Sequence, residues 1–451
     1  MTDAALLDEQ SLHGWVVSQR WFASKAREVA QMNVLDAKAL RQEEPELHLL
    51  LLEARFPEGT HDVYQVPLGV RSRFDEGVIA TGADGRVVYD MLADPELTTY
   101  VPRLIERGAG IGDLRFQVAE GGPEIGEPAS SRAMGVEQSN SSLVFDERLV
   151  LKVFRRLEPG TNPELEMLRF LTAKGFPNIA ALAGWYSYEG RIVDATLGVL
   201  QEFLADGRDG WELTLDTMGD AAQIERLADL GRVTGQMHTT LASDSSDPHF
   251  APEDPSDEYL SLLHADVDEQ IERLWRDLPE DDERVADVAG SGEDVRELLN
   301  QLSTVSAGGK LIRTHGDYHL GQTMLTDRGW VILDFEGEPA RPLPERRRKQ
   351  SPLRDVAGML RSFAYAQSAM SLLRGGEAPA GWEASAREAF LDAYIDTVDP
   401  SLLPAGASAT ERLLSVFELE KAVYELRYEL NNRPDWVAIP AAAIRRLLEA
   451  A

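Results

Sequence analysis

Runs of hydrophobic residues in the first part of the chain predict short strands. Residues 47–54 are almost entirely apolar and predict a buried strand, and residues 63–68 predict another. Asp84-Gly85 lies between the apolar stretches 78–80 and 87–89, which predicts a hairpin turn. With a short helical stretch near residues 12–21, these patterns predict a small α+β unit over residues 1–95.

The next segment, residues 96–204, predicts a helix at 95–107 followed by a strand-rich lobe. Its strands are expected at residues 143–145, 148–154 and 197–204. Lys152 stands inside an otherwise apolar strand, and a buried ammonium group is costly unless it is paired. Glu166, on a helix that opens at Asn162, is the expected partner. The alternative is an edge-strand lysine that points into solvent.

Helical periodicity dominates from residue 205 to the end. Apolar residues recur at helical spacing through residues 227–241 and 262–278, and further helices are expected at 356–366 and 420–433, where Pro434 ends the last one. The expected fold class is therefore α+β. The expected domains are 1–95, 96–204 and 205–451.

Composition narrows the range of functions. The chain of 451 residues has 43% hydrophobic and 27% charged residues, as soluble globular proteins do. Its 77 acidic residues outnumber 45 basic ones, a net charge of −32 that repels nucleic acid and anionic membranes, so neither is expected as a partner. The absence of cysteine excludes disulfides, thiolate zinc sites and cysteine nucleophiles. With no signal-like start and no long apolar run, a cytoplasmic location is expected.

One segment carries the most specific chemistry. The loop 315–322 (HGDYHLGQ) contains Asp317 and Gln322, and the apolar strand 330–333 ends at Asp334. A carboxylate base followed by two oxygen ligands for Mg²⁺ suits phosphoryl transfer from ATP. An ordinary turn and strand are the alternative, which the combination of motifs disfavours. Protein kinases carry asparagine where this chain has Gln322, whose longer stem keeps the same ligand atom.

Other residues are candidates for the nucleotide site and its support. Lys152 and Glu166 form the kind of pair that positions ATP phosphates in kinases. The polar turn 135–142 and the linker after strand 197–204 are candidate phosphate and adenine contacts, although a plain hairpin and an ordinary linker explain them equally well. From these segments we select Ser139, Asn140, Ser141, Ser142, Gln201 and Phe203. Asp355 opens a helix and is expected to hold the catalytic loop backbone.

The segment 420–436 combines aromatic, acidic and amide residues on a helix. Tyr424 and Tyr428 share one face, as do Glu425 and Glu429. Aromatic rings cover the apolar faces of sugars, while acids and amides bind hydroxyl groups. A partly buried tyrosine seam is the alternative. The basic run 341–349 has two open explanations, a phosphate or partner contact and a loop pinned by carboxylates.

Together these motifs resemble the actinobacterial maltokinases over the whole length of the chain. The resemblance rests on residues 20–22, 137–142, 151–156, 162–166, 315–322, 334–339 and 420–436. It implies a bilobal protein-kinase-like fold, with a β-rich N-lobe, a mainly helical C-lobe and an additional small α+β N-terminal cap. It also implies conversion of maltose to maltose 1-phosphate with ATP and Mg²⁺, feeding α-glucan (glycogen) biosynthesis, and association with trehalose synthase.

By this resemblance, Asp317 is the base, and Gln322 and Asp334 are the metal ligands. The sugar contacts that it implies are His319, Tyr424, Glu425, Tyr428, Glu429, Asn432, Arg433 and Trp436. Two other functions stay open: a kinase of another sugar or aminosugar such as glucosamine, and a non-catalytic partner subunit of trehalose synthase. A scaffold would need none of the phosphotransfer residues, which argues against the second.

Overall fold

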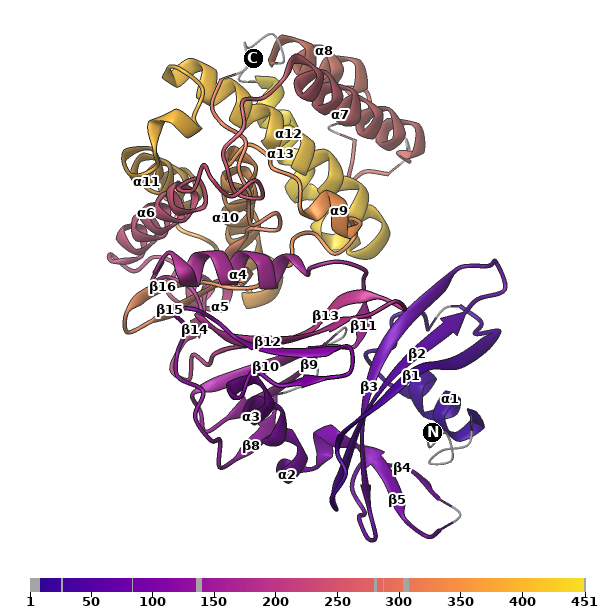
Figure 1. The fold of residues 1–451 in the computed structure, drawn as a ribbon. Helices are drawn as coiled ribbons and strands as arrows, with labels where there is room; N and C mark the ends of the chain where they lie inside the picture. The colour runs from indigo at the N-terminus through magenta and orange to yellow at the C-terminus, as the bar shows by residue number, and fades with distance from the viewer. Residues whose placement is uncertain are drawn as a thin grey trace. The chain divides into compact units, whose positions relative to one another are not determined.

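The computed structural model describes residues 9–25, 27–82, 84–134, 140–279, 282–286, 288–302 and 308–449. The chain divides into two compact units, residues 1–205 and residues 206–451. Strands dominate the first unit and helices the second (Figure 1). Over the described ranges, no helix is both long enough and apolar enough to cross a membrane.

The first unit begins with a twisted antiparallel sheet that carries helix α1 (Glu9–Ser18). Within the described residues this sheet has six strands, in the order β1-β2-β3-β5-β4 with β11 on β3. Their bounds are β1 Gln31–Arg41, β2 Glu46–Arg55, β3 His61–Arg71, β4 Val78–Thr81, β5 Val87–Asp90 and β11 Arg156–Leu157. The strands predicted at 47–54 and 63–68 and the hairpin around Gly85 are present.

A second antiparallel sheet follows, of seven strands in the part of the chain that is described. Its order is β6-β7-β12-β13-β10-β9-β8. The bounds are β6 Gly110–Ile111, β7 Leu114–Val118, β8 Ser131–Ala133, β9 Asn140–Phe145, β10 Leu149–Phe154, β12 Leu182–Glu189 and β13 Asp194–Glu202. The helix expected over 95–107 is two helices, α2 (Pro95–Thr98) and α3 (Tyr100–Glu106). Pro102 lacks the amide hydrogen that would bond back to Thr98, which explains the break.

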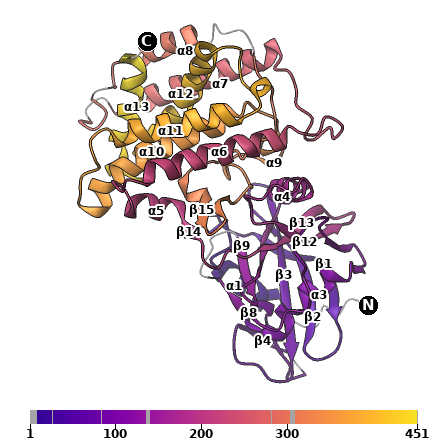
Figure 2. The ribbon, with the colours of Figure 1, turned by 90° about the vertical axis from the view of Figure 1, so that its left-hand side faces the viewer.

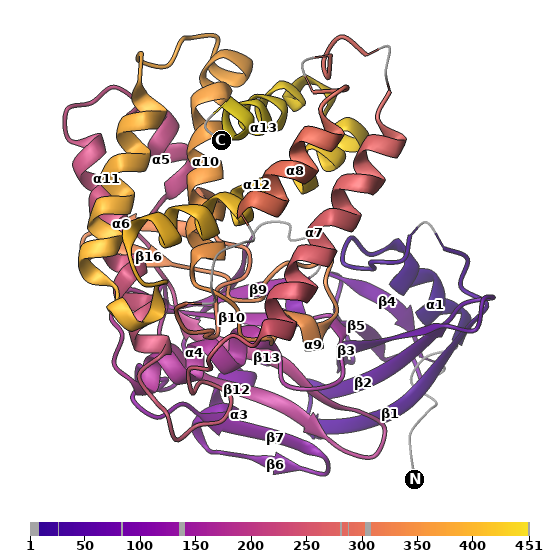
Figure 3. The ribbon, with the colours of Figure 1, turned by 90° about the horizontal axis from the view of Figure 1, so that it is seen from above.

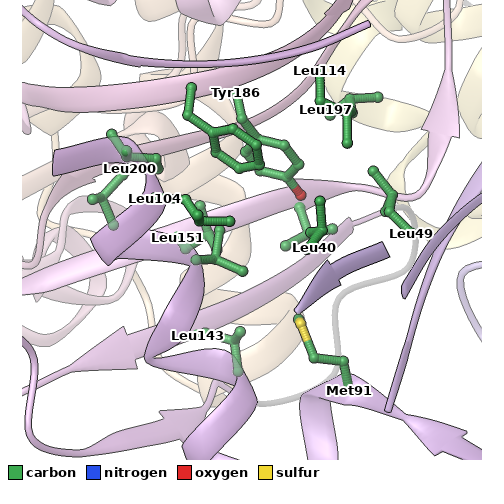
Figure 4. Packing of buried hydrophobic residues seen from close by; sticks show 14 of the residues in the cluster. Leu40, Leu49, Met91, Leu104, Leu114, Leu143, Leu151, Tyr186, Leu197 and Leu200 are labelled. Atoms are coloured by element: carbon green, nitrogen blue, oxygen red, sulfur yellow. The ribbon is translucent and has the colours of Figure 1, made fainter. Parts of the chain in front are cut away.

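The two sheets of the first unit share one hydrophobic core. Leu40, Leu49 and Met91 of the N-terminal region pack in the same buried cluster as Leu151 and Leu200 of the second sheet (Figure 4). Burying these side chains together removes apolar surface of both sheets from water. Residues 1–95 and the second sheet are therefore stabilised as one body.

A buried polar contact also joins the two sheets. Arg155 is fully buried, and its Nε donates to Ser141 Oγ (2.9 Å) while its Nη2 donates to Asp90 (3.1 Å). Its guanidinium lies 4.9 Å from the ring of Trp21. A buried charge is tolerated only with such partners. Arg155 therefore links β9 to two residues of the N-terminal region.

The second unit is a helical assembly with a small sheet, β14 (Arg208–Asp209), β15 (Thr323–Thr326) and β16 (Gly329–Ile332). Its helices are α5 Gly210–Asp216, α6 Gln223–Leu241, α7 Asp257–Asp277, α8 Gly292–Leu302, α9 Leu343–Arg346, α10 Leu353–Arg374, α11 Trp382–Thr397, α12 Ala407–Asn432 and α13 Ala438–Glu449. Figure 2 shows α6, α10 and α11 side by side. Figure 3 shows α7 and α8 beside α12, with which they share an apolar cluster.

We expect Arg155→Met to lower the free energy of unfolding by about 3–5 kcal/mol, because it leaves Asp90 facing a buried site without its cation. Arg156→Met is the matched control. Arg156 pairs with Asp62 at 2.7 Å, but its side chain is 48% exposed, so the loss should be about 1 kcal/mol or less. Urea unfolding of the full chain measures both. Equal losses for the two variants would contradict the structural role given to Arg155.

Candidate active site

The loop 315–322 is held in place by one buried carboxylate. Asp355, in the first turn of α10, accepts the backbone N–H of His315 (2.7 Å) and of Gly316 (2.9 Å). His238 of α6 lies against the same carboxylate, with Nε2 3.1 Å from Oδ2. Helix α10 begins at Leu353, so Asp355 lies inside the helix and caps the loop, not its own helix.

These contacts also set the charge of Asp355. Burial by itself raises the pKa of this carboxyl group, but the hydrogen bond to His238 and that from Gly316 outweigh it and lower the pKa below the usual value. Asp355 is therefore ionised at neutral pH. His238 is fully buried and also hydrogen-bonds to Tyr394 (3.0 Å).

Close approach of α10 to the loop fixes the position of the next residues. A Cβ on Gly358 would lie 2.6 Å from the carbonyl oxygen of Tyr318, so only glycine fits there. Gly316 adopts a φ of +84°, which glycine tolerates without strain. Tyr318 is buried, and its hydroxyl lies 2.8 Å from Thr234 Oγ1. The loop is thereby anchored on α6 and α10, with Asp317 between the anchors.

Asp317 is partly exposed, whereas His315 and Tyr318 of the same loop are buried. Its side chain is 25% accessible, with Oδ1 3.9 Å from Lys421 Nζ and Oδ2 4.0 Å from His319 Nε2. Desolvation lowers the pKa of His319 despite the opposing effect of the Asp317 charge, so this histidine is neutral at pH 7. Asp317 is thus a carboxylate that a bound hydroxyl group can reach.

Gln322 and Asp334 lie side by side beyond the loop. Gln322 closes a short 3-10 helix, Leu320–Gln322, and its Nε2 donates to Asp334 Oδ2 at 3.2 Å. Asp334 adopts a φ of 59°, an uncommon conformation for a residue with a side chain and one that recurs at functional sites. Turning the Gln322 amide over would present its oxygen beside the carboxylate. This donor set fits a hard divalent cation such as Mg²⁺.

A cavity of ≈ 650 Å³ opens beside Asp317 in the second unit. Helix α12 and the loops after β16 supply most of its wall. The lining residues are Trp211, Asp317, His319, Gly321, Glu338, Pro339, Ala340, Gly358, Ser362, Tyr365, Lys421, Tyr424, Glu425, Tyr428, Glu429, Arg433 and Trp436. Of the expected sugar contacts, only Asn432 is absent from this wall. Its exposed side chain donates instead to the carbonyl of Tyr428 (2.9 Å).

The wall combines aromatic rings with carboxylates that are already ion-paired. The rings of Tyr424 and Tyr428 are stacked with centroids 6.4 Å apart, and 37% and 44% of these residues remain exposed. Burial and the nearby Glu338 raise the pKa of Tyr424 to about 12, so its hydroxyl stays protonated. Exposed ring faces next to polar groups are suited to a sugar.

In the first unit, Lys152 of β10 has a carboxylate partner on helix α4. Its Nζ lies 2.9 Å from Glu164 Oε2, in the first turn of this helix, which begins at Pro163. Glu166, the partner expected from the sequence, is buried on the same helix at 3% exposure. The structure thus adds Glu164 to the expected pair, and the pairing of Lys152 with Glu166 stays a prediction.

The other nucleotide candidates lie on the same sheet. Ser139 lies outside the described residues, while Asn140, Ser141 and Ser142 belong to β9. Ser141 Oγ accepts from Arg155, so this hydroxyl already has a structural partner. Gln201 is the residue before the last of β13 and pairs with Val150, while the amide of Phe203, just after this strand, donates to the carbonyl of Arg148 at 2.8 Å.

Comparison with known proteins identifies the family. A sequence model of the phosphotransferase enzyme family matches residues 125–399, more than half of the chain. The chain belongs to this family. A model of the maltokinase N-terminal cap domain matches residues 15–94 as well. The first unit of this phosphotransferase therefore begins with a maltokinase-type cap, and the fold is the bilobal, kinase-like α+β fold.

Relatives of this phosphotransferase include two glucosamine kinases. That of Streptacidiphilus jiangxiensis is 28% identical over 410 residues, which is 86% of this chain and 89% of the relative. That of Mycolicibacterium smegmatis is 26% identical over 341 residues, 70% of this chain and 79% of the relative. A solved glucosamine kinase in complex with glucosamine, ADP and inorganic phosphate has a TM-score of 0.72 at 21% identity, covering 96% of this chain and 98% of that one.

The residues of the cavity wall that sequence reasoning missed include Trp211, Glu338, Tyr365 and Lys421. Lys421 stands three and four residues before Tyr424 and Glu425, so helical periodicity could have found it. Trp211 and Tyr365 come from other helices, and no spacing in the sequence relates them to α12.

The basic run 341–349 is held by acceptors at both of its ends. Arg341 pairs with Glu338 of the cavity wall (2.7 Å), and Lys349 binds Glu253 (2.5 Å) and the carbonyl of Pro248 (2.8 Å). These contacts favour the loop pinned by carboxylates.

We expect Asp355→Asn to destabilise this phosphotransferase by about 1–3 kcal/mol at neutral pH, because a buried backbone donor loses its charged acceptor. The folded-state pKa of Asp355 is lowered, so its contribution is complete above about pH 4 and falls as the pH drops through that lowered value. Thermal melts of both proteins from pH 7 downwards measure the difference. A difference that grows in acid would contradict the ionised state of Asp355.

Proposed function

We propose that this phosphotransferase transfers the γ-phosphoryl group of ATP to maltose and forms maltose 1-phosphate. The maltokinase-type cap over residues 15–94 is the observation that carries the choice of maltose. The cavity beside Asp317 supports it, because ≈ 650 Å³ lies within the range of small-molecule sites and can hold two sugar rings. The resemblance of residues 420–436 to maltokinases points the same way.

In this proposal Asp317 is the catalytic base. Its carboxylate accepts the proton of the reducing-end hydroxyl as that oxygen attacks the γ-phosphorus and the bond to the β-phosphate oxygen breaks. The anchors on Asp355, His238 and Tyr318 hold Asp317 in one position, which such a transfer needs. Lys421 Nζ lies 3.9 Å from the carboxylate of this base.

The nucleotide side rests on residues of the first unit. Lys152, with Glu164 as its partner, is proposed to bind ATP phosphates, and Asn140, Ser142, Gln201 and Phe203 are proposed to contact the rest of the nucleotide. Gln322 and Asp334 would hold Mg²⁺, which would offset the negative charge of the phosphates when bound. Glu166, buried on the same helix as Glu164, stays a proposed member of the nucleotide site.

The sugar side rests on the wall of the cavity. Tyr424, Tyr428 and Trp436 are proposed to cover the apolar faces of the two rings, with His319 near the acceptor hydroxyl. Glucosamine is the second candidate substrate, because the two relatives described above are glucosamine kinases. A role in glycogen synthesis, a cytoplasmic location and association with trehalose synthase rest on the resemblance of the sequence to maltokinases.

A substrate panel tests the proposal. We expect incubation with ATP, Mg²⁺ and maltose to give a sugar phosphate whose phosphorus NMR signal couples to an anomeric proton, because the acceptor is the reducing-end hydroxyl. Glucose, trehalose, glucosamine and an aminoglycoside are the comparisons. Turnover of glucosamine without turnover of maltose would refute the choice of maltose and leave the phosphotransferase assignment intact.

The base is tested by Asp317→Asn, which keeps the size of the side chain and removes its ability to take a proton. We expect kcat to fall by about 10²–10⁴-fold, with ATP affinity unchanged within about threefold. Asp327→Asn, at an exposed position in the turn between β15 and β16, is the matched control and should keep full activity. A near-normal rate for Asp317→Asn would show that another group acts as the base.

A further inference from the structure

The cavity beside Asp317 is electrically balanced, although the whole chain carries a net charge of −32. Four carboxylates line it, and each has a cation of its own within 4.0 Å. The pairs are Asp317 with Lys421 (3.9 Å), Glu338 with Arg341 (2.7 Å), Glu425 with Arg361 (2.8 Å) and Glu429 with Arg433 (2.5 Å). A bound ligand therefore meets no carboxylate that lacks a positive neighbour.

Two of these pairs have a buried member. The side chains of Arg361 and Glu429 are each 1% exposed, so each depends on its partner for charge compensation, whereas Arg433, the partner of Glu429, is 46% exposed. Glu429 also accepts the hydroxyl of Tyr365 at 3.0 Å. Both carboxylates thus have their acceptor capacity and their charge largely satisfied before any ligand enters.

Three aromatic rings of the wall, which also attract cations, each have a cation nearby. Lys421 Nζ lies 5.5 Å from the ring centre of Tyr424. The guanidinium of Arg433 lies 5.5 Å from the ring of Tyr428 and 5.1 Å from that of Trp436. Each of these distances is within the range of a cation–π contact. Lys421 and Arg433 therefore serve both a carboxylate and an aromatic ring.

We propose that the cavity selects electrically neutral sugars and rejects cationic aminosugars, with Lys421 and Arg433 as the residues that decide this specificity. A protonated aminosugar must lose water around its ammonium group on entry, while the four carboxylates and the rings of Tyr424, Tyr428 and Trp436 that could compensate this loss already have a cation nearby. It also meets Lys421 and Arg433 as like charges, which disfavours binding. A neutral polyol pays neither cost and still finds hydroxyl, carboxylate and ring contacts.

This inference rests on the proposed function, since it specifies the substrate class of the same site. Lys421 is the better probe of the two residues, because its side chain is 34% exposed and its loss disturbs less buried structure than loss of the Arg433 pair.

The test compares glucose with glucosamine, which differ in charge through a single substituent. Isothermal titration of each sugar into the full chain, with Mg²⁺ and a non-hydrolysable ATP analogue present, gives the affinity ratio. We expect the unmodified protein to prefer glucose by at least about tenfold at pH 6.5, where the amine is protonated. Lys421→Met should reduce this preference by about tenfold, while Lys421→Arg, which keeps the charge, should retain it.

Arg433→Gln and Arg433→Lys form a second matched pair with the same expectation. Equal affinities of the unmodified protein for the two sugars would overturn the proposal, as would equal effects of Lys421→Met and Lys421→Arg. If neither glucose nor maltose binds, the proposal is overturned too, because it requires a neutral sugar to occupy the cavity. Failure of the proposed function shows separately, as an absence of maltose 1-phosphate despite sugar binding.

Discussion

The Asp355 carboxylate is the contact on which the candidate active site depends. It accepts two consecutive backbone N–H groups of the loop and faces His238, so that helices α6 and α10 and the loop meet at one buried charge. A single ionised group can hold a loop this firmly because buried donors left without an acceptor cost more than the bond itself contributes. The position of Asp317 follows from this contact, since it comes directly after the two bonded amides.

Helix α12 supplies five of the residues that line the cavity beside Asp317. Residues 421, 424, 425, 428 and 429 recur at intervals of three and four, so they form one continuous face on the wall of the cavity. Lys421 on this face, and Arg433 just beyond the end of the helix, each lie near both a ring and a carboxylate. A rigid helix presents such a pattern with little freedom, which is the condition for discriminating between ligands of similar shape.

Much of this arrangement could be predicted from the sequence, and the remainder has identifiable causes. Asp317, Gln322 and Asp334 were found because they are close in the chain and separated by a recognisable strand. The contact of Lys152 with Glu164 was not expected, because the side chains that a helix presents depend on where its first turn begins, here at Pro163. Glu338, Tyr365 and Trp211 were missed because only the fold brings their separate elements to one cavity. Asn432 was included because it lies one helical turn after Tyr428, but its side chain donates to the backbone carbonyl of Tyr428.

The hydrophobic core that the two sheets of the first unit share limits which fragments of the chain can fold on their own. Leu40, Leu49 and Met91 belong to the region that matches the cap, yet they are buried with Leu151 and Leu200 of the sheet that carries Lys152. A fragment that begins after residue 95 would therefore expose one apolar side of that sheet to water and leave Arg155 without Asp90 and Trp21. The division between the regions that the two family models match therefore does not coincide with a division between independently folding parts.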